Sequence, residues 1–449
     1  MQRILSTLLA FGFLLGSTEA DDVTSPPPPK LAPLMRDFMG INGHFTFRPA
    51  LYRPVCGLVR NYHPTGWDIG DDTSRPPDFP VARTNRVNWA DLYGSWKKEG
   101  FTIDASLQFE SIPQAKWKSP EADARAYGEA FARAFGPSTR NLVTSAEIGN
   151  EPEKWDLPAY RKLFEAMARG LRAGDPKLKI VTAAASASPG KPDPYSQSVA
   201  TFDGLGDLYD VLNVHTYSMI EGWPTWRRVA PETPGIPYLR AVTEMTAWRD
   251  AHAPGKEVWV TEFGYDAGTK KPEPGTFEKW VSSTETEQAR WLVRSFLLFS
   301  SLGVDRAYLY YYDDRDEPSF HASSGITRNF VPKPAYHAVA HLYATLGDYR
   351  FSRVVKDRKE DGLHVFEYVN PDKPKEPIWV AWLGGSPAER DLAKVIVNLD
   401  LPEGARVARL ETMPLGAGAP PDEDAIIASA SGWSGRLGPS PVYLWLKLP

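Results

Sequence analysis

Residues 142–184 have the sequence LVTSAEIGNEPEKWDLPAYRKLFEAMARGLRAGDPKLKIVTAA, and this stretch decides the fold class. Two short apolar segments, residues 142–148 and 178–184, enclose residues 158–173, whose apolar side chains recur at helical spacing. The predicted helix begins at a proline and ends before a glycine, which are common residues at those positions. A strand, a helix and a second strand in this order form the repeating unit of a parallel sheet.

The same alternation extends over residues 37–346. Further strands are predicted at residues 38–45, 57–62, 101–109, 211–217, 257–261 and 307–312, and further helices at residues 88–99, 121–135 and 284–302. Eight strands with helices between them favour a closed barrel over an open sheet. We therefore predict an α/β fold, a catalytic (β/α)8 TIM barrel.

The pattern changes after residue 346. Short strand-like segments at residues 363–369, 378–383, 394–399, 405–410 and 442–448 are separated by turn residues, without helical periodicity. Residues 347–449 are therefore predicted to form a small C-terminal β-sandwich that packs on the barrel. We expect it to support the barrel structurally, with sugar binding as the alternative.

The N-terminus has the pattern of a secretory signal peptide, predicted at residues 1–20. Arg3 precedes an apolar run at residues 4–15, and small residues indicate cleavage after Ala20. Residues 21–36 are rich in proline and are predicted to be a stiff linker. The apolar run is too short to span a membrane, and no later stretch reaches the length needed, so we expect a secreted or periplasmic protein without a membrane span.

The composition is that of a globular protein, with 42% hydrophobic and 24% charged residues. The formal net charge is -5 and no basic tract is present, which argues against a nucleic-acid partner. Cys56 is the only cysteine, so the chain has no internal disulfide, and we expect a packed thiol. The 15 tryptophans suit both core packing and stacking against sugar rings. A monomer is expected.

Two motifs place a carboxylate at the end of a predicted barrel strand: residues 147–153 (EIGNEPE) and residues 258–265 (VWVTEFGY). Active sites of such barrels lie at the carboxyl ends of the strands. An acidic residue there is costly unless it has a partner or a function. Glu151 and Glu262 are 111 residues apart in sequence, a separation that fits three βα units, and their side chains are predicted to converge at the barrel mouth.

Two converging carboxyl groups suit the cleavage of a glycosidic bond. One carboxylate approaches the anomeric carbon, and the second carboxyl group protonates the departing oxygen. Each motif alone is a weak signal, because Glu151 also suits a helix N-terminus and Glu262 also suits a salt bridge. The position of both at strand ends, in this order, favours the catalytic interpretation.

The chain resembles glycoside hydrolase clan A, and within it family 39 and related cellulase-like barrels. The residues that carry the resemblance are 149–152 (GNEP), 261–264 (TEFG), 214–218 (VHTYS) and 325–336. The resemblance covers the barrel and, in outline, the β-domain. It implies a retaining β-glycoside hydrolase acting on a β-linked oligo- or polysaccharide by double displacement. In that role Glu151 is the acid/base, Glu262 is the nucleophile, and Asn150 donates a hydrogen bond to the sugar 2-hydroxyl.

Further residues complete the predicted site. Arg60 is expected to hold Glu262 ionised, with a surface ion pair as the alternative. Tyr217 is expected to donate to Glu262, with core packing as the alternative, and His215 is expected to contact the substrate. Trp67, and also Trp223, are candidates for sugar platforms. In the predicted eighth strand this chain has tyrosines where many clan members have a tryptophan, which bears on the identity of the reacting sugar. Other acidic residues near strand ends are taken as bystanders: Glu110, Glu153, Asp313 and Asp314.

Three other hypotheses remain. The first is a secreted, non-catalytic carbohydrate-binding protein on a clan A barrel. The second is a metal-dependent barrel hydrolase, which would require clustered histidines, whereas the eight histidines are scattered in sequence. No metal and no cofactor are therefore predicted. The third is an inverting hydrolase, which the distance between the two carboxyl groups distinguishes from a retaining one.

Overall fold

The computed structural model describes residues 30–152, 155–189, 195–222, 225–272, 274–275, 278–358, 361–384, 395–418, 427–429 and 432–449. The predicted signal peptide, most of the predicted linker, Glu153 and Trp223 lie outside the described residues. The chain divides into residues 1–31 and 32–449, and every helix and strand below belongs to the second unit. Among the described residues, no helix is long and apolar enough to cross a membrane.

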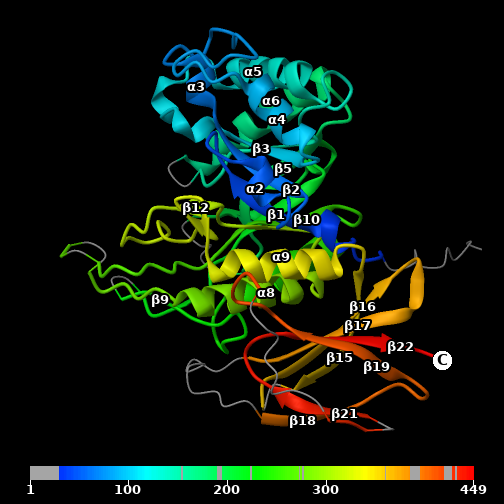
Figure 1. Cartoon of the computed structure of the whole chain (residues 1–449). Coiled ribbons are helices and arrows are strands. Elements are labelled where there is room, and N and C mark those ends of the chain that lie inside the picture. The colour runs from blue at the N-terminus through cyan, green and yellow to red at the C-terminus, as the bar shows by residue number, and fades with distance from the viewer. Residues whose placement is uncertain are drawn as a thin grey trace, which may run out of the picture. The chain divides into compact units, whose positions relative to one another are not determined.

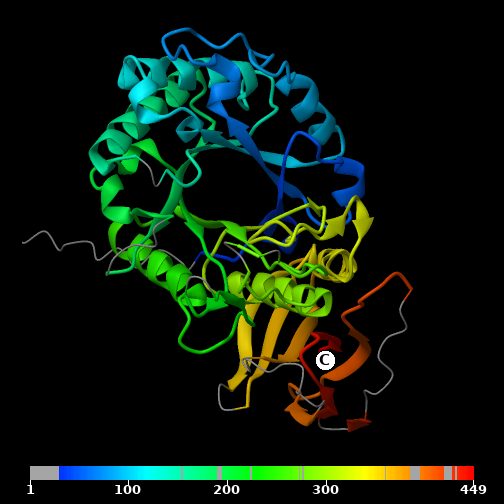
Figure 2. The same cartoon turned by 90° about the vertical axis from the view of Figure 1, so that its left-hand side faces the viewer.

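Eight parallel strands form a closed barrel, which Figure 2 shows as a ring. Each strand pairs in parallel with the next, β4 pairs with β5, and the last strand pairs with the first. The strands in order are β1 (Met39–Gly43), β2 (Leu58–Pro64), β3 (Thr102–Gln108), β4 (Ser145–Ile148), β5 (Lys179–Ser186), β7 (Val211–His215), β10 (Glu257–Phe263) and β11 (Arg306–Leu309). The predicted (β/α)8 barrel is confirmed.

Helices surround this ring (Figures 1 and 2). The longer ones are α4 (Trp89–Lys98), α5 (Pro120–Phe135), α6 (Leu157–Gly174), α7 (Tyr238–His252), α8 (Glu285–Ser300) and α9 (Pro334–Leu346). Short helices are α1 (Met35–Phe38), α2 (Pro49–Tyr52) and α3 (Thr65–Ile69), with 3-10 turns at Phe109–Ser111, Gln114–Lys116, Val199–Phe202 and Gly206–Leu208. Helices α5 and α6 pack closely because Gly170 has no side chain. A Cβ atom there would lie 2.1 Å from the backbone oxygen of Arg125.

One strand end that matters for the site differs from the sequence prediction. Strand β10 continues to Phe263 and so contains Glu262, whereas the prediction ended it at residue 261. Its register against β7 shifts between Val260 and Glu262, an irregularity that sequence periodicity does not reveal. Short strands also form in the loops: β6 (Gln197–Ser198), β8 (Met219–Ile220), β9 (Arg227–Arg228), β12 (Asp313–Asp314), β13 (Thr327–Arg328) and β14 (Val331–Pro332).

Two antiparallel sheets follow the barrel. One contains β15 (Arg350–Arg358), β16 (Leu363–Asn370), β17 (Lys373–Leu383), β22 (Val442–Lys447) and β19 (Arg406–Thr412), and the other contains β18 (Val395–Asp400), β21 (Gly432–Leu437) and β20 (Ile427–Ser429). Both sheets contribute to one apolar core, in which Val365 and Trp379 of the first sheet join Val397 and Trp433 of the second. The predicted C-terminal β-sandwich is confirmed.

A buried polar contact joins this sandwich to the barrel. Trp382 on β17 donates a hydrogen bond of 2.8 Å to the Oε1 atom of Glu232, which also pairs with Arg294 on α8. The hydroxyl groups of Ser300 and Tyr368 lie 2.9 Å apart nearby. Burial alone would raise the pKa of Glu232, but Arg294, together with the charge of His364 and the hydrogen bond from Trp382, lowers it. Glu232 therefore contacts both the barrel helix α8 and the sandwich strand β17.

The interior of the barrel also contains a fully buried carboxyl group, that of Asp104, which forms no ion pair with any residue that the structure describes. Asp104 on β3 is fully buried, and burial raises its pKa to about 6, although Ser145, Arg60 and Arg306 each act to lower it. The folded pKa exceeds the usual value of 3.8. The free energy of unfolding therefore falls as the pH rises from about 4 to about 6 and stays at the lower value above that.

We therefore expect an Asp104→Asn variant to gain stability relative to the wild type as the pH rises from 4 to 8. A pKa shift of this size changes the difference between their unfolding free energies by about 2–3 kcal/mol between pH 4 and pH 8. Urea denaturation of both proteins at pH 4 and pH 8 measures it, and any constant cost of the new amide cancels in the comparison. A difference that does not change with pH would contradict the assigned ionisation.

Candidate active site

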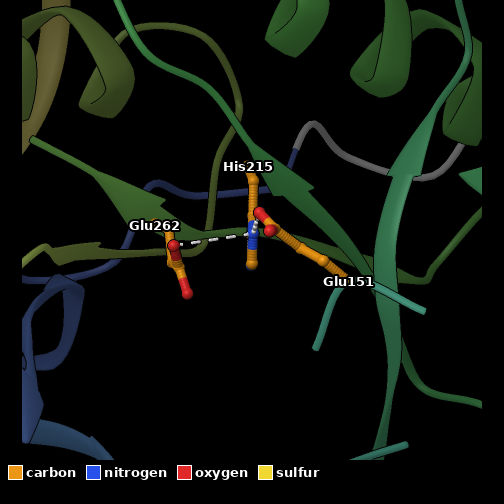
Figure 3. Close-up of side chains that lie close together, drawn as sticks. All are labelled: Glu151, His215 and Glu262. Carbon is orange, nitrogen blue, oxygen red and sulfur yellow. Dashed lines mark hydrogen bonds and ion pairs between the residues drawn. The ribbon is translucent and has the colours of Figure 1, made fainter. Parts of the chain in front are cut away.

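Three barrel strands bring a carboxylate, an imidazole and a second carboxylate together. Glu151 follows β4 by three residues, His215 ends β7, and Glu262 lies near the end of β10. One oxygen or nitrogen atom from each of the three lies within 4.8 Å of the others. Figure 3 shows the imidazole between the two carboxylates. Both predicted catalytic residues thus lie at the same end of the barrel and face each other.

Glu262 is buried and held by three hydrogen-bond donors. Its Oε1 atom accepts from Arg60 at 3.0 Å and from the Tyr62 hydroxyl at 2.6 Å, and its Oε2 atom accepts from Tyr217 at 2.8 Å. Burial alone would raise the pKa of Glu262, but His215, Arg60 and the two phenols outweigh burial and lower it. The carboxylate is therefore ionised, as the prediction for Arg60 and Tyr217 requires.

Arg60 on β2 is fully buried, so the alternative of a surface ion pair is wrong. Its Nε and Nη2 atoms each lie 2.7 Å from an oxygen of Glu147, which forms a bidentate ion pair. Its remaining donors reach the side-chain oxygen of Asn42 at 2.8 Å, that of Asn150 at 2.7 Å, and Glu262. Because every side of the guanidinium is engaged, Arg60 is fixed in orientation and its charge is largely offset by Glu147.

Glu151 has a different environment from Glu262. Its side chain is 25% exposed, and its Oε1 atom lies 2.7 Å from the Nδ1 atom of His215. Burial raises the pKa of Glu151, the Glu262 carboxylate adds to the increase, and His215 acts against it. The two carboxyl groups therefore have pKa values shifted in opposite directions, which is typical of an acid and a nucleophile that share one site.

The hydrogen-bond network fixes the tautomer of His215. The Thr261 hydroxyl donates to the side-chain oxygen of Asn213 at 2.6 Å, so it can only accept from the His215 Nε2 atom, which lies 2.9 Å away. The Nε2 atom therefore carries a hydrogen. The Nδ1 atom faces Glu151, and a single proton shared between these two groups completes their hydrogen bond.

Asn150 is held from two directions. Its side-chain oxygen accepts from Arg60, which orients its amide nitrogen as a donor for a ligand. Its backbone N–H donates to the Oε1 atom of Glu110 at 2.6 Å. Burial raises the pKa of Glu110 to about 7, against backbone donors that lower it. Glu110 is therefore more than the predicted bystander, because it fixes the peptide that carries Asn150 and Glu151.

Trp67 packs among other aromatic rings. Its ring centroid lies 5.6 Å from that of His44, 5.9 Å from that of Phe45 and 6.1 Å from that of Trp89. Phe45 is 47% exposed, whereas Trp67 is half-buried. Among the contacts of the described residues, none joins Trp67 to Glu151 or Glu262. Trp67 lies in α3, directly after the carboxyl end of β2, and its role as a sugar platform stays a prediction.

The remaining predicted residues divide between the site and the scaffold. Tyr310 is one of the tyrosines of the predicted eighth strand, where many clan members have a tryptophan. Its ring centroid lies 6.4 Å from that of Tyr217, so Tyr310 borders the site. Asp314 is buried in ion pairs with Arg328 and Lys333, as expected of a bystander. Tyr62 was not predicted as a site residue, although it lies two residues after Arg60 and therefore on the same face of β2.

A (β/α)8 barrel with an attached β-sandwich and a carboxylate pair at its mouth is thus defined. No protein-family profile matches the sequence, and no curated protein is similar to it in sequence. The fold is similar to that of a family 39 glycoside hydrolase from the gut symbiont Bacteroides cellulosilyticus WH2, with 17% identity and a TM-score of 0.67, over 92% of this chain and 81% of that one.

Two further solved structures are similar. A glucosidase from Croceicoccus marinus has 15% identity and a TM-score of 0.62, over 94% of this chain and 98% of its own. CelM2, a bifunctional glucanase-xylanase protein from a metagenome library, has 11% identity and a TM-score of 0.60, over 93% and 97%. The predicted resemblance in fold is confirmed. At sequence identities this low, the similarity shows the fold alone.

Proposed function

We propose that the protein is a retaining glycoside hydrolase that acts on a β-linked oligo- or polysaccharide. The observation that carries the proposal is the pair of facing carboxylates, Glu151 and Glu262, with pKa values shifted in opposite directions. The similarity in fold to a family 39 glycoside hydrolase, a glucosidase and a glucanase-xylanase supports it. The class of substrate rests on these neighbours and on the resemblance of the two motifs.

In the first step the Glu262 carboxylate attacks the anomeric carbon of the sugar. The bond to the leaving oxygen breaks, and Glu151 transfers its proton to that oxygen. The product is a glycosyl ester of Glu262. Arg60, Tyr62 and Tyr217 aim the carboxylate and keep it ionised before the attack. The oriented amide nitrogen of Asn150 suits a hydrogen bond to the sugar 2-hydroxyl.

In the second step the roles of the two glutamates change. Since the ester removes the negative charge of Glu262, the pKa of Glu151 falls, and Glu151 takes a proton from an incoming water. The water oxygen attacks the anomeric carbon and releases Glu262. Before the first step His215 shares a hydrogen bond with Glu151 and so holds its carboxyl group in place as a proton donor.

The distance between the carboxyl groups favours retention over inversion. Inverting enzymes hold their carboxyl groups about 6.5–9.5 Å apart to admit a water, and retaining enzymes about 5–5.5 Å. One oxygen atom of Glu151 and one of Glu262 lie within 4.8 Å of each other, which is closer to the separation in retaining enzymes than to that in inverting ones. We also propose that the protein is exported, on the basis of its N-terminal sequence pattern.

Hydrolysis of a panel of β-glycans and aryl β-glycosides tests the proposal, with Glu262→Gln as the control. The proposal predicts turnover by the wild type on at least one substrate and loss of turnover in the variant. Binding of a glycan by both proteins, with equal inactivity on every substrate, would instead support the non-catalytic carbohydrate-binding protein.

A Tyr217→Phe variant is expected to lower kcat about 10-fold, because a hydrogen bond to a charged group contributes about 1.5–3 kcal/mol. Loss of the donor raises the pKa of Glu262, so the acidic limb of the kcat/KM profile moves to higher pH. A Tyr336→Phe variant is the matched control, since the Tyr336 hydroxyl donates to the Leu51 backbone outside the site. An acidic limb that stays in place would contradict the role of Tyr217.

A further inference from the structure

We propose that Glu151, His215 and Glu262 also form a binding site for a divalent transition-metal ion such as Zn²⁺, and that the bound ion excludes the substrate. The metal would be an inhibitor and not a cofactor. Binding of the ion follows from the geometry alone, whereas competition with a substrate rests on the proposed function.

The three ligand atoms are close to the spacing of a tetrahedral zinc site. Zinc bonds of about 2.0–2.2 Å to nitrogen and oxygen place ligand atoms roughly 3.3 Å apart. The Nδ1 atom of His215 lies 2.7 Å from Glu151 and 3.7 Å from Glu262, and all three ligand atoms lie within 4.8 Å of one another. Small side-chain rotations therefore suffice, and Glu151, which is partly exposed, has room to make them.

The tautomer of His215 is the one that a metal ligand requires. Its Nε2–H donates to Thr261, which in turn donates to Asn213, so the lone pair of neutral His215 lies on Nδ1, between the two carboxylates. Histidines that bind metals characteristically donate their second ring N–H in this way, and the acceptor orients the ring. The Thr261 hydroxyl would therefore orient the His215 ring without itself binding the metal ion.

The charge of the site also favours a cation. Glu151 and Glu262 bring two carboxylates to one point, and the nearest positive group, Arg60, is already paired with Glu147 through two bonds of 2.7 Å. The other groups that face Glu262 are the neutral phenols of Tyr62 and Tyr217. Arg60 bonds to the Oε1 atom of Glu262, which leaves a lone pair of Oε2 for the ion.

Occupation of this position is incompatible with the proposed catalysis. The ion would replace the proton that Glu151 and His215 share, and it would engage the oxygen of Glu262 that faces Glu151. Neither glutamate can then act on a sugar. The fourth coordination position would face the exposed side of Glu151 and hold water. The inhibition is therefore expected to raise the apparent KM and leave kcat unchanged.

Equilibrium dialysis of the chelator-treated, metal-free protein against Zn²⁺ tests the site, with metal content measured by mass spectrometry. Co²⁺ in place of Zn²⁺ adds the visible absorption of a tetrahedral ion. The wild type is expected to bind one ion that His215→Gln does not bind. Thr261→Val, which keeps the ligands, is expected to bind about 10-fold more weakly. His252→Gln, on the exposed end of α7, is the matched control and is expected to bind like the wild type.

Equal binding by the wild type and His215→Gln would place the ion on surface groups and overturn the proposal. Activity that is lost on chelation and restored by Zn²⁺ would overturn its inhibitory role. If His215→Gln and Thr261→Val lose affinity as expected but no glycan is hydrolysed by the metal-free wild type, the metal site is supported and only the proposed function fails.

Discussion

A Glu262→Gln variant is expected to lose kcat by about 10⁴-fold or more, the largest effect of any single substitution in the chain. The amide is nearly the same size as the carboxylate and can still bond to Tyr62 or Tyr217, so the fold is kept. It cannot, however, form the glycosyl ester. Initial rates on the substrate found by the glycan panel, with circular dichroism to verify folding, measure the loss.

The control is Glu257→Gln, at the opposite end of the same strand. Glu257 pairs with Lys179 at 2.6 Å and is remote from the barrel mouth. This variant is expected to keep kcat within a factor of about 3, as a surface substitution does. The smaller Glu262→Ala variant adds a diagnostic, because azide can enter the vacated space and form a glycosyl azide of inverted configuration. A Glu262→Gln variant with a tenth of wild-type activity would show that Glu262 is not the nucleophile.

A Glu151→Ala variant is expected to lose about 10²–10⁴-fold in kcat on a natural glycan, the range that general acid catalysis contributes. The size of the loss should depend on the leaving group. An aryl glycoside that releases a dinitrophenolate needs no proton, so the first step stays fast and the ester accumulates, because water is no longer activated. Stopped-flow kinetics should then show a burst, and azide should accelerate turnover.

The pH profile gives an independent readout of the same residue. Since the pKa of Glu151 is raised and the acid works only when protonated, wild-type kcat/KM falls as the pH rises through that pKa. The Glu151→Ala variant should lose this alkaline limb. Glu165→Gln on α6, where Glu165 pairs with Arg169, is the control and should retain it. Equal losses on all leaving groups, with the alkaline limb intact, would contradict the assignment.

The barrel was predictable because two periodicities alternate along the chain. Residues 142–184 alone contain a strand, an amphipathic helix and a strand, and the structure has β4, α6 and β5 there. The position of Glu151 and Glu262 at the mouth follows from the same argument, since both lie near the carboxyl ends of barrel strands. The continuation of β10 through Glu262 was not predictable, because it depends on a register shift against β7.

The partners of the two glutamates were predictable only in part. Arg60 and Tyr217 were predicted to bond to Glu262, and Tyr62 is two residues from Arg60, so the alternation of a strand places both on one face. The contact between His215 and Thr261 joins two strands, and its geometry depends on strand register and barrel tilt. Sequence alone sets neither of these.

Contacts between elements distant in sequence lay beyond the sequence analysis for the same reason. The bond between Glu110 and the backbone of Asn150 spans 40 residues, and the bond between Trp382 and Glu232 joins the sandwich to the barrel across 150. Each depends on packing that a local pattern does not encode.

In the proposed mechanism Glu262 forms a covalent bond to the sugar, and Glu151 does not. Incubation with activated 2-deoxy-2-fluoro β-glycosides, chosen to match the sugar of the hydrolysed glycan, slows release of the ester and allows tryptic peptides to be mapped by mass spectrometry. We predict one added fluoroglycosyl group on the peptide of residues 257–270. A label on residues 141–154, or hydrolysis of the parent glycan with no label on either peptide, would contradict the account.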